Sequence, residues 1–110
     1  MSLFDGIIKI VKTASTPLVD LHDATKTAPV SMGCYKLYCN GLKYVGKAEE
    51  GLRRSLRCCY NGGVPQMNAA RKIYENRNNI KVCWVVCNTR EQVRALEERW
   101  LRELNLEWNM

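Results

Sequence analysis

The dipeptide Asn40-Gly41 most constrains what this chain can fold into, because it separates two apolar runs that both contain tyrosine. A two-residue β-hairpin loop of type I′ needs positive φ at both central residues, and Asn-Gly adopts that conformation readily. We therefore predict a β-hairpin within residues 33–48. A loop of this length also sets the strand register. The predicted pairs are Cys39 with Leu42, Leu37 with Tyr44, and Tyr35 with Gly46.

This register brings two tyrosine rings together on one face of the hairpin. Tyr35 and Tyr44 occupy diagonal cross-strand positions, which long side chains can bridge. Tyr38 falls on the opposite face. The residues predicted to share the face with the tyrosine pair are Leu37, Cys39, Leu42 and Gly46. Such a pair serves either simple packing or chemistry, and the spacing alone leaves both open.

The rest of the chain predicts helices around a small sheet. Apolar residues recur at helical spacing within 51–60, and Pro65 indicates the start of a second helix, predicted over 67–76. The apolar run 80–87 is typical of a strand buried on both faces. A last helix is predicted over 89–104, with Asn88 and Glu91 as its capping pair. Trp108 is expected to return to the sheet. The fold class predicted is α+β, a mainly antiparallel three-stranded sheet that begins with the hairpin and is flanked by helices.

Residues 1–30 are predicted to form a separate N-terminal arm, and residues 31–110 the α+β domain. Phe4, Ile7, Ile8 and Val11 have the spacing of a short amphipathic helix, which Pro17 would end. Residues 24–32 are interpreted as a connector. The arm either packs on the domain or serves in dimerisation or in binding another protein.

The positive charge of the chain lies entirely outside this arm. Three lysines and three aspartates cancel within residues 1–30, so the fourteen basic and eight acidic residues of 31–110 carry the whole net charge of +6. A basic domain of this kind favours a polyanionic partner, and nucleic acid is the most plausible one. The alternative is ordinary solubilising surface charge.

The six cysteines and the lack of long apolar runs indicate an intracellular protein. The cysteine spacing does not match a zinc site, and His22 is the sole histidine. We therefore expect the cysteines to be small buried hydrophobic residues that are kept reduced in the cytoplasm. No run of about 18 apolar residues is present, and the first residues lack a signal-peptide pattern, so no membrane association is expected.

One carboxylate stands among the apolar positions of the predicted last helix. Glu97 lies four residues after Val93 and three before Trp100. Burying a lone carboxylate costs several kcal/mol, which means that Glu97 needs a partner. That partner is either a nearby arginine or lysine, or a hard divalent cation such as Mg²⁺, which prefers oxygen ligands and keeps most of its waters.

These features together resemble the GIY-YIG nucleases. The segment GCY at 33–35, followed by YVG at 44–46 and Lys47-Ala48, is similar to the paired signature of that family. The resemblance continues through a basic helix, a buried strand, and a final helix with Glu97 before an aromatic-Asn pair at 108–109. It covers residues 33–110.

The resemblance implies a DNA endonuclease that hydrolyses phosphodiester bonds with one Mg²⁺, or Mn²⁺ in its place. Glu97 would hold the metal, and Tyr35 would be the general base or a water-positioning group. Tyr44 would join its hydrogen-bond network. Because a tyrosine pKa near 10 suits a base poorly, positive charge and the metal would have to lower it. The catalytic residues implied are Tyr35, Tyr44, Lys47, Arg54 and Glu97, and those expected to contact DNA are Lys47, Arg53, Arg54 and Arg57.

The basic helix departs from the family pattern. Family enzymes carry an arginine there, with a histidine or tyrosine four residues later. The hydrophobic register of Leu52 and Leu56 puts Ser55 and Cys59 at those positions, whereas sliding by one gives Arg54 and Cys58. The alternative function is therefore a nucleic-acid-binding module with impaired catalysis.

Overall fold

The computed structural model describes residues 16–110, and the predicted helix over Phe4–Val11 lies outside this range. The described elements begin with a two-residue strand and a short helix and continue through the hairpin to the C-terminal turn. They are β1 (Val19–Asp20), α2 (Leu21–Thr27), β2 (Gly33–Tyr38), β3 (Leu42–Ala48), α3 (Leu52–Tyr60), α4 (Met67–Asn76), η1 (Arg77–Asn79), β4 (Lys81–Val86), α5 (Arg90–Glu103) and η2 (Glu107–Asn109).

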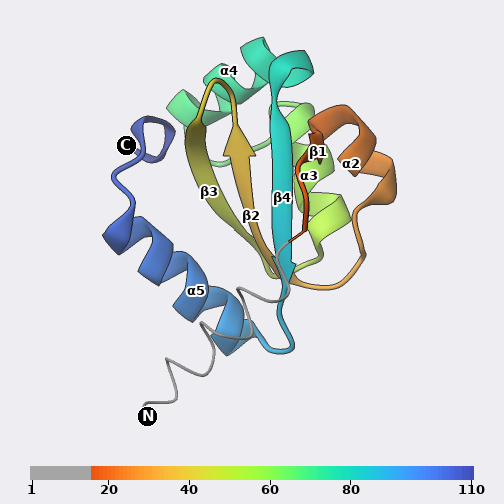
Figure 1. Cartoon of the computed structure of the whole chain (residues 1–110), viewed down its shortest axis with the longest axis vertical. Helices are drawn as coiled ribbons and strands as arrows, with labels where there is room; N and C mark the ends of the chain where they lie inside the picture. The colour runs from red at the N-terminus through yellow and green to blue at the C-terminus, as the bar shows by residue number, and fades with distance from the viewer. Residues whose placement is uncertain (1–15) are drawn as a thin grey trace.

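The described chain contains a single antiparallel sheet with strand order β1-β4-β2-β3, and other residues pack on both of its faces. Helices α2 and α3 lie on one side of it and α5 on the other, with α4 at one end (Figure 1). The prediction of an α+β fold with an antiparallel sheet is confirmed. The sheet has four strands instead of three, because Val19 and Asp20 pair with Val82 and Lys81 of β4.

The predicted hairpin is present, and most of its register is correct. Asn40 and Gly41 have φ values of 55° and 102°, as a type I′ turn requires. The predicted pairs Leu37 with Tyr44 and Tyr35 with Gly46 are confirmed. The register then shifts after Leu37. As a result, Leu42 pairs with Tyr38 and not with Cys39 as predicted. Leu42 also packs with the residues of α5, and not beside Tyr35 and Tyr44 as predicted.

Residues 24–27, predicted as part of a connector, belong to helix α2. The backbone N–H of Leu21 donates to the carbonyl of Ile80, which anchors the start of this helix at the end of the sheet. Leu21 and Ala24 are fully buried in the same cluster as Tyr35. Sequence periodicity missed the helix because its seven residues are too few to display a repeating apolar face.

The N-cap of helix α5 is Thr89, one residue later than predicted. The Thr89 hydroxyl accepts a hydrogen bond from the Gln92 N–H at 3.1 Å, and the Gln92 side chain accepts from the Asn88 N–H at 2.8 Å. Threonine and glutamine thus replace the predicted Asn88 and Glu91 pair. Val93, Leu96 and Trp100 form the buried face of this helix, and Leu101 is 43% exposed.

Candidate active site

An open cleft of about 570 Å³ lies beside the edge strand β3. It takes side chains from β2, β3, α3 and α5, which come from positions as far apart as 35 and 97 in the sequence. The predicted catalytic residues that line this one cleft are Tyr35, Tyr44, Lys47, Arg54 and Glu97.

The two tyrosines form a buried wall of the cleft. Tyr35 is 4% exposed and Tyr44 is 7% exposed, and their ring centroids are 6.3 Å apart at an interplanar angle of 38°. The Tyr35 ring passes over Gly46, where an added Cβ would come within 2.4 Å of the Tyr35 hydroxyl oxygen. The Tyr35 ring therefore occupies the space that a side chain at Gly46 would need.

The environment of this wall keeps both tyrosines protonated. Burial raises the pKa of Tyr35 well above its ordinary value, and the neighbouring Cys59 and Tyr44 add to that shift. Burial also raises the pKa of Tyr44. We expected positive charge and a bound metal together to lower the tyrosine pKa; the protein groups alone raise it at both residues. Desolvation of the phenolate dominates over the more distant cations.

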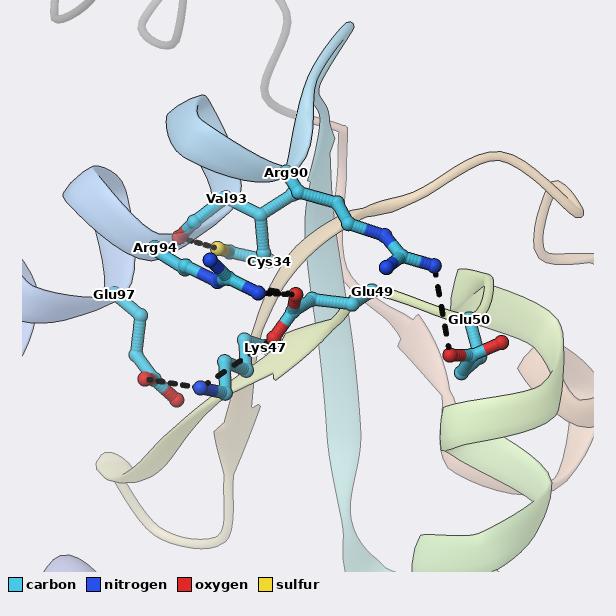
Figure 2. Close-up of polar contacts among 8 residues, drawn as sticks. All are labelled: Cys34, Lys47, Glu49, Glu50, Arg90, Val93, Arg94 and Glu97. Atoms are coloured by element: carbon cyan, nitrogen blue, oxygen red, sulfur yellow. Dashed lines mark hydrogen bonds and ion pairs between the residues drawn. The ribbon is translucent and has the colours of Figure 1, made fainter.

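Lys47 and Glu97 form a charged wall of the cleft, which continues beyond the cleft lining through Glu49 and Arg94 (Figure 2). The Lys47 ammonium lies 3.5 Å from Glu49 Oε2 and 4.0 Å from Glu97 Oε1, so it stands between two carboxylates. Arg94 in turn donates to Glu49 Oε1 through Nε at 3.1 Å and Nη2 at 2.9 Å. This bond lowers the pKa of Glu49. The wall is thus a chain of alternating charges, in which Glu49 is satisfied mainly by Arg94.

Glu97 is the least satisfied member of that chain. Its side chain is 21% exposed, and the contact to Lys47 is at the outer limit of an ion pair. Burial raises the pKa of the Glu97 carboxyl, and the Lys47 ammonium opposes the shift. A basic partner for Glu97 is therefore present as a long ion pair, and the carboxylate also lines the open cleft.

Helix α3 buries the apolar residues on which the hydrophobic register is based. Leu52, Leu56 and Cys59 are fully buried, and Ser55 faces the cleft. The Cys59 thiol lies 3.3 Å from the Tyr35 hydroxyl in a buried hydrogen bond. In the hydrophobic register Ser55 and Cys59 take the positions of the family's arginine and its histidine or tyrosine, and in the shifted register Arg54 and Cys58 do. Arg54 is exposed at the rim of the cleft.

The other two arginines of α3 point away from the cleft. Arg53 Nε donates to the Ala28 carbonyl at 2.8 Å, and Arg57 Nε donates to the Thr25 carbonyl at 2.9 Å. Both acceptors lie at the C-terminal end of α2. These predicted nucleic-acid-binding residues are thus separated from Lys47, while Arg54 lies near both groups.

Asn109 was missing from the predicted site, although it lines the cleft. Its side-chain amide donates to the Val45 carbonyl and accepts from the Val45 N–H, each at 3.0 Å. This pair of bonds holds the C-terminal turn against the edge strand between Tyr44 and Gly46. The aromatic-Asn pair at 108–109 was the available signal. Glu49 was also missed, although its position two residues after Lys47 suggested it.

None of the six cysteines, which all lie within residues 16–110, forms a disulfide bond, and four of them are buried. Cys58 is exposed, which corrects the expectation of burial at that position. Within residues 16–110 no group of three or more histidine, cysteine or acidic side chains is arranged to hold a metal ion. No helix in the same range is long and apolar enough to cross a membrane.

Comparison with solved structures shows the fold class of this domain. The N-terminal endonuclease domain of UvrC from Thermotoga maritima, bound to its catalytic magnesium, matches with a TM-score of 0.65 at 23% sequence identity, covering 82% of this chain and 96% of that one. A point mutant of the same domain, bound to its catalytic divalent cation, matches with a TM-score of 0.65 at 23% identity, over 82% and 94% of the two chains.

These domains are of the GIY-YIG type, and the chain accordingly has a GIY-YIG-like fold. The resemblance inferred from its sequence is confirmed at that level. No model of a protein family matches the sequence, and no curated protein does.

Proposed function

We propose that this protein is a nuclease that hydrolyses DNA phosphodiester bonds with the help of one divalent cation, Mg²⁺ or Mn²⁺. The observation that carries the proposal is the gathering of Tyr35, Tyr44, Lys47, Arg54 and Glu97 around one cleft. A GIY-YIG-like fold and solved neighbours that bind a catalytic divalent cation support it.

The residues of the cleft fit a single, mostly hydrated cation. Mg²⁺ is commonly bound by one or two carboxylates and keeps several waters. Glu97 offers such a carboxylate, half-buried and held only at 4.0 Å by Lys47. When bound, the cation would polarise a phosphoryl oxygen and stabilise the leaving oxygen.

The protein side chains divide the remaining work. With its pKa raised by burial, Tyr35 is poorly suited to be a phenolate base and better suited to orient the attacking water as a neutral hydroxyl. Tyr44 supports its ring, while Lys47 and Arg54 supply positive charge to the phosphate. The attacking water oxygen would form a bond to phosphorus as the bond to the sugar oxygen breaks, with the proton of that water passing to bulk water in the open cleft and bulk water protonating the departing sugar oxygen.

A second candidate is a nucleic-acid-binding module with impaired catalysis. It is favoured by Ser55 and Cys59, which in the hydrophobic register stand where the related pattern carries an arginine and a histidine or tyrosine. Loss of a comparable charge-stabilising donor costs on the order of 100-fold to 1,000-fold in rate. The choice between the two functions depends on whether Arg54, at the rim of the cleft, supplies the positive charge that stabilises the transition state.

The test is cleavage of supercoiled plasmid DNA in the presence of Mg²⁺ or Mn²⁺. The wild-type protein should nick the plasmid, and Glu97→Ala should abolish nicking. Glu98→Ala is the matched control, because Glu98 lies next on the same helix and is exposed at an ion pair with Arg102. A metal-dependent rise in the unfolding temperature should also disappear in Glu97→Ala. Cleavage that survives Glu97→Ala would overturn the mechanism.

The proposal keeps the wider expectations made from the sequence. We infer a cytoplasmic protein whose partner is DNA, with residues 31–110 as the nuclease domain. Residues 19–28 of the predicted arm pack on this domain, and residues 1–15 would serve for self-association or for binding another protein. Deleting residues 1–15 and measuring the oligomeric state tests that role, and an unchanged oligomer and unchanged partners would contradict it.

A further inference from the structure

A second groove of about 480 Å³ lies beside the active-site cleft, along the other exposed side of α3. One of its walls is the exposed face of that helix, and Val30 of the α2–β2 connection contributes to the other. The residues shared by the groove and the cleft are Glu50, Arg54, Cys58 and Gly63. The groove therefore continues from the cleft, with Arg54 at their common boundary.

Three arginines give the groove its character. Arg53, Arg54 and Arg57 line it, against the single carboxylate of Glu50. Glu50 is itself paired with Arg90 of α5 at 3.7 Å (Figure 2). The lining thus has a net positive charge, and it lies outside the network of Lys47, Glu49 and Glu97.

Helix α2 holds two of these arginines in place. The carbonyls of Thr25 and Ala28, at the C-terminal end of α2, accept from Arg57 Nε and Arg53 Nε. Helix C-termini carry partial negative charge and attract cations. Each contact uses one of the five N–H donors of a guanidinium group, and the terminal fork is the part that binds phosphate in a bidentate way. Holding the side chain in advance lowers the entropy lost on binding.

We propose that this groove binds the phosphodiester backbone of duplex DNA next to the phosphate held in the cleft. The inference rests on the DNA substrate of the proposed function. The polyanion matches the charge of the lining, and continuity through Arg54 lets one DNA strand run from the cleft into the groove. Helix α2 then belongs to the DNA-binding surface, although residues 1–30 were predicted to form a separate arm.

Val30 offers a test that removes no native hydrogen bond. Its side chain is 73% exposed and lines the groove. Binding to a fluorescent DNA duplex is measured without divalent metal, in chelator, between about 50 and 200 mM salt. Val30→Glu should weaken binding several-fold. Val30→Lys should strengthen it and steepen the plot of log affinity against log salt by about 0.9, the value for one additional phosphate contact.

Leu18→Lys is the matched control, because Leu18 is 48% exposed and lines neither the groove nor the cleft. It adds the same charge and should leave the salt slope unchanged. Arg57→Gln should reduce the slope by about 0.9, whereas Arg102→Gln, which removes an equal charge on α5, should not. A role of the groove in DNA binding is excluded if Val30→Lys and Leu18→Lys change the affinity equally, or if Val30→Glu binds DNA as the wild type does.

The result is independent of catalysis. If the Val30 variants alter binding as expected but the wild type fails to nick plasmid DNA, the nuclease proposal falls and the groove stands. If plasmid nicking requires Glu97 but the Val30 variants bind as the wild type does, the groove falls and the nuclease stands.

Discussion

The two walls of the active-site cleft are built by different physical means. The tyrosine wall belongs to the main apolar cluster, where Tyr35 and Tyr44 pack with Leu37, Leu56 and Trp108. The charged wall consists of ion pairs at 2.9–4.0 Å between partly exposed side chains. Exposed ion pairs contribute little to stability, whereas buried aromatic rings contribute several kcal/mol. The tyrosines therefore cannot be altered without disturbing the fold, and the charges can.

The largest expected effect separates the two walls by stability. Tyr35→Ala should lower the free energy of unfolding by about 3–5 kcal/mol, because it leaves a cavity in the core. Lys47→Ala should change it by about 0.5 kcal/mol or less, because Lys47 is a surface residue. Urea denaturation of both variants measures the difference. Equal costs would mean that the walls do not differ as described.

Asn109→Ala should have the next largest effect, because Asn109 joins the edge strand to the C-terminal turn. Two hydrogen bonds to Val45 are lost, at a cost of about 1–3 kcal/mol. Asn68→Ala is the control, since Asn68 is an exposed asparagine whose side-chain hydrogen bond to the Met110 carbonyl is long, at 3.5 Å. Hydrogen exchange at the Val45 amide should accelerate in Asn109→Ala only. Unchanged protection there would show that the amide does not hold the strand.

High pH should weaken the tyrosine wall. An unfolded tyrosine loses its proton near pH 10, whereas burial raises the pKa of Tyr35 well above that value in the folded protein. Above pH 10 the unfolded state then binds fewer protons, so stability falls as the pH rises, by about 1.4 kcal/mol per pH unit for this group. The free energy of unfolding of Tyr35→Phe should fall less steeply with pH, by that amount per pH unit. Parallel curves for the two proteins would contradict the assigned burial.

The smallest effect sharpens the description of the charged wall. Because Arg94 donates two hydrogen bonds to Glu49, the pKa of Glu49 should lie below that of an ordinary glutamate. Titration followed by NMR of the side-chain carboxyl should show this, and Arg94→Gln should return the pKa toward its usual range. Arg99→Gln, on the same helix, should leave it unchanged.

Local patterns in the sequence predicted most of the fold. The helix α4 was predicted with its observed ends, and the hairpin was predicted down to the pairing of Tyr35 with Gly46. The misses lie where tertiary contacts decide the structure. Strand β1 has two residues and exists because β4 offers it a free edge. The shift after Leu37 changes the local pairing in a way that side-chain alternation cannot reveal.

The candidate site was predictable in its members but not in its electrostatics. The motif spacing and the misplaced Glu97 selected five residues that do line one cleft. Their pKa shifts depend on burial and on neighbours distant in sequence, such as Cys59 beside Tyr35. The contacts of Arg53 and Arg57 with α2 were equally out of reach, because the helix itself was not predicted.

The neighbouring thiols of α3, Cys58 and Cys59, should differ in their reactivity with alkylating reagents, and this difference reports whether the tyrosine wall is closed. Cys58 is exposed, while Cys59 is fully buried against Tyr35, and burial raises the pKa of the Cys59 thiol to about 12. Thiolates are the species that react with alkylating reagents. Cys58 will therefore be modified in the native protein, and Cys59 only when the wall beside Tyr35 opens. Two adjacent residues in one tryptic map thus record surface exposure and cleft opening in the same sample.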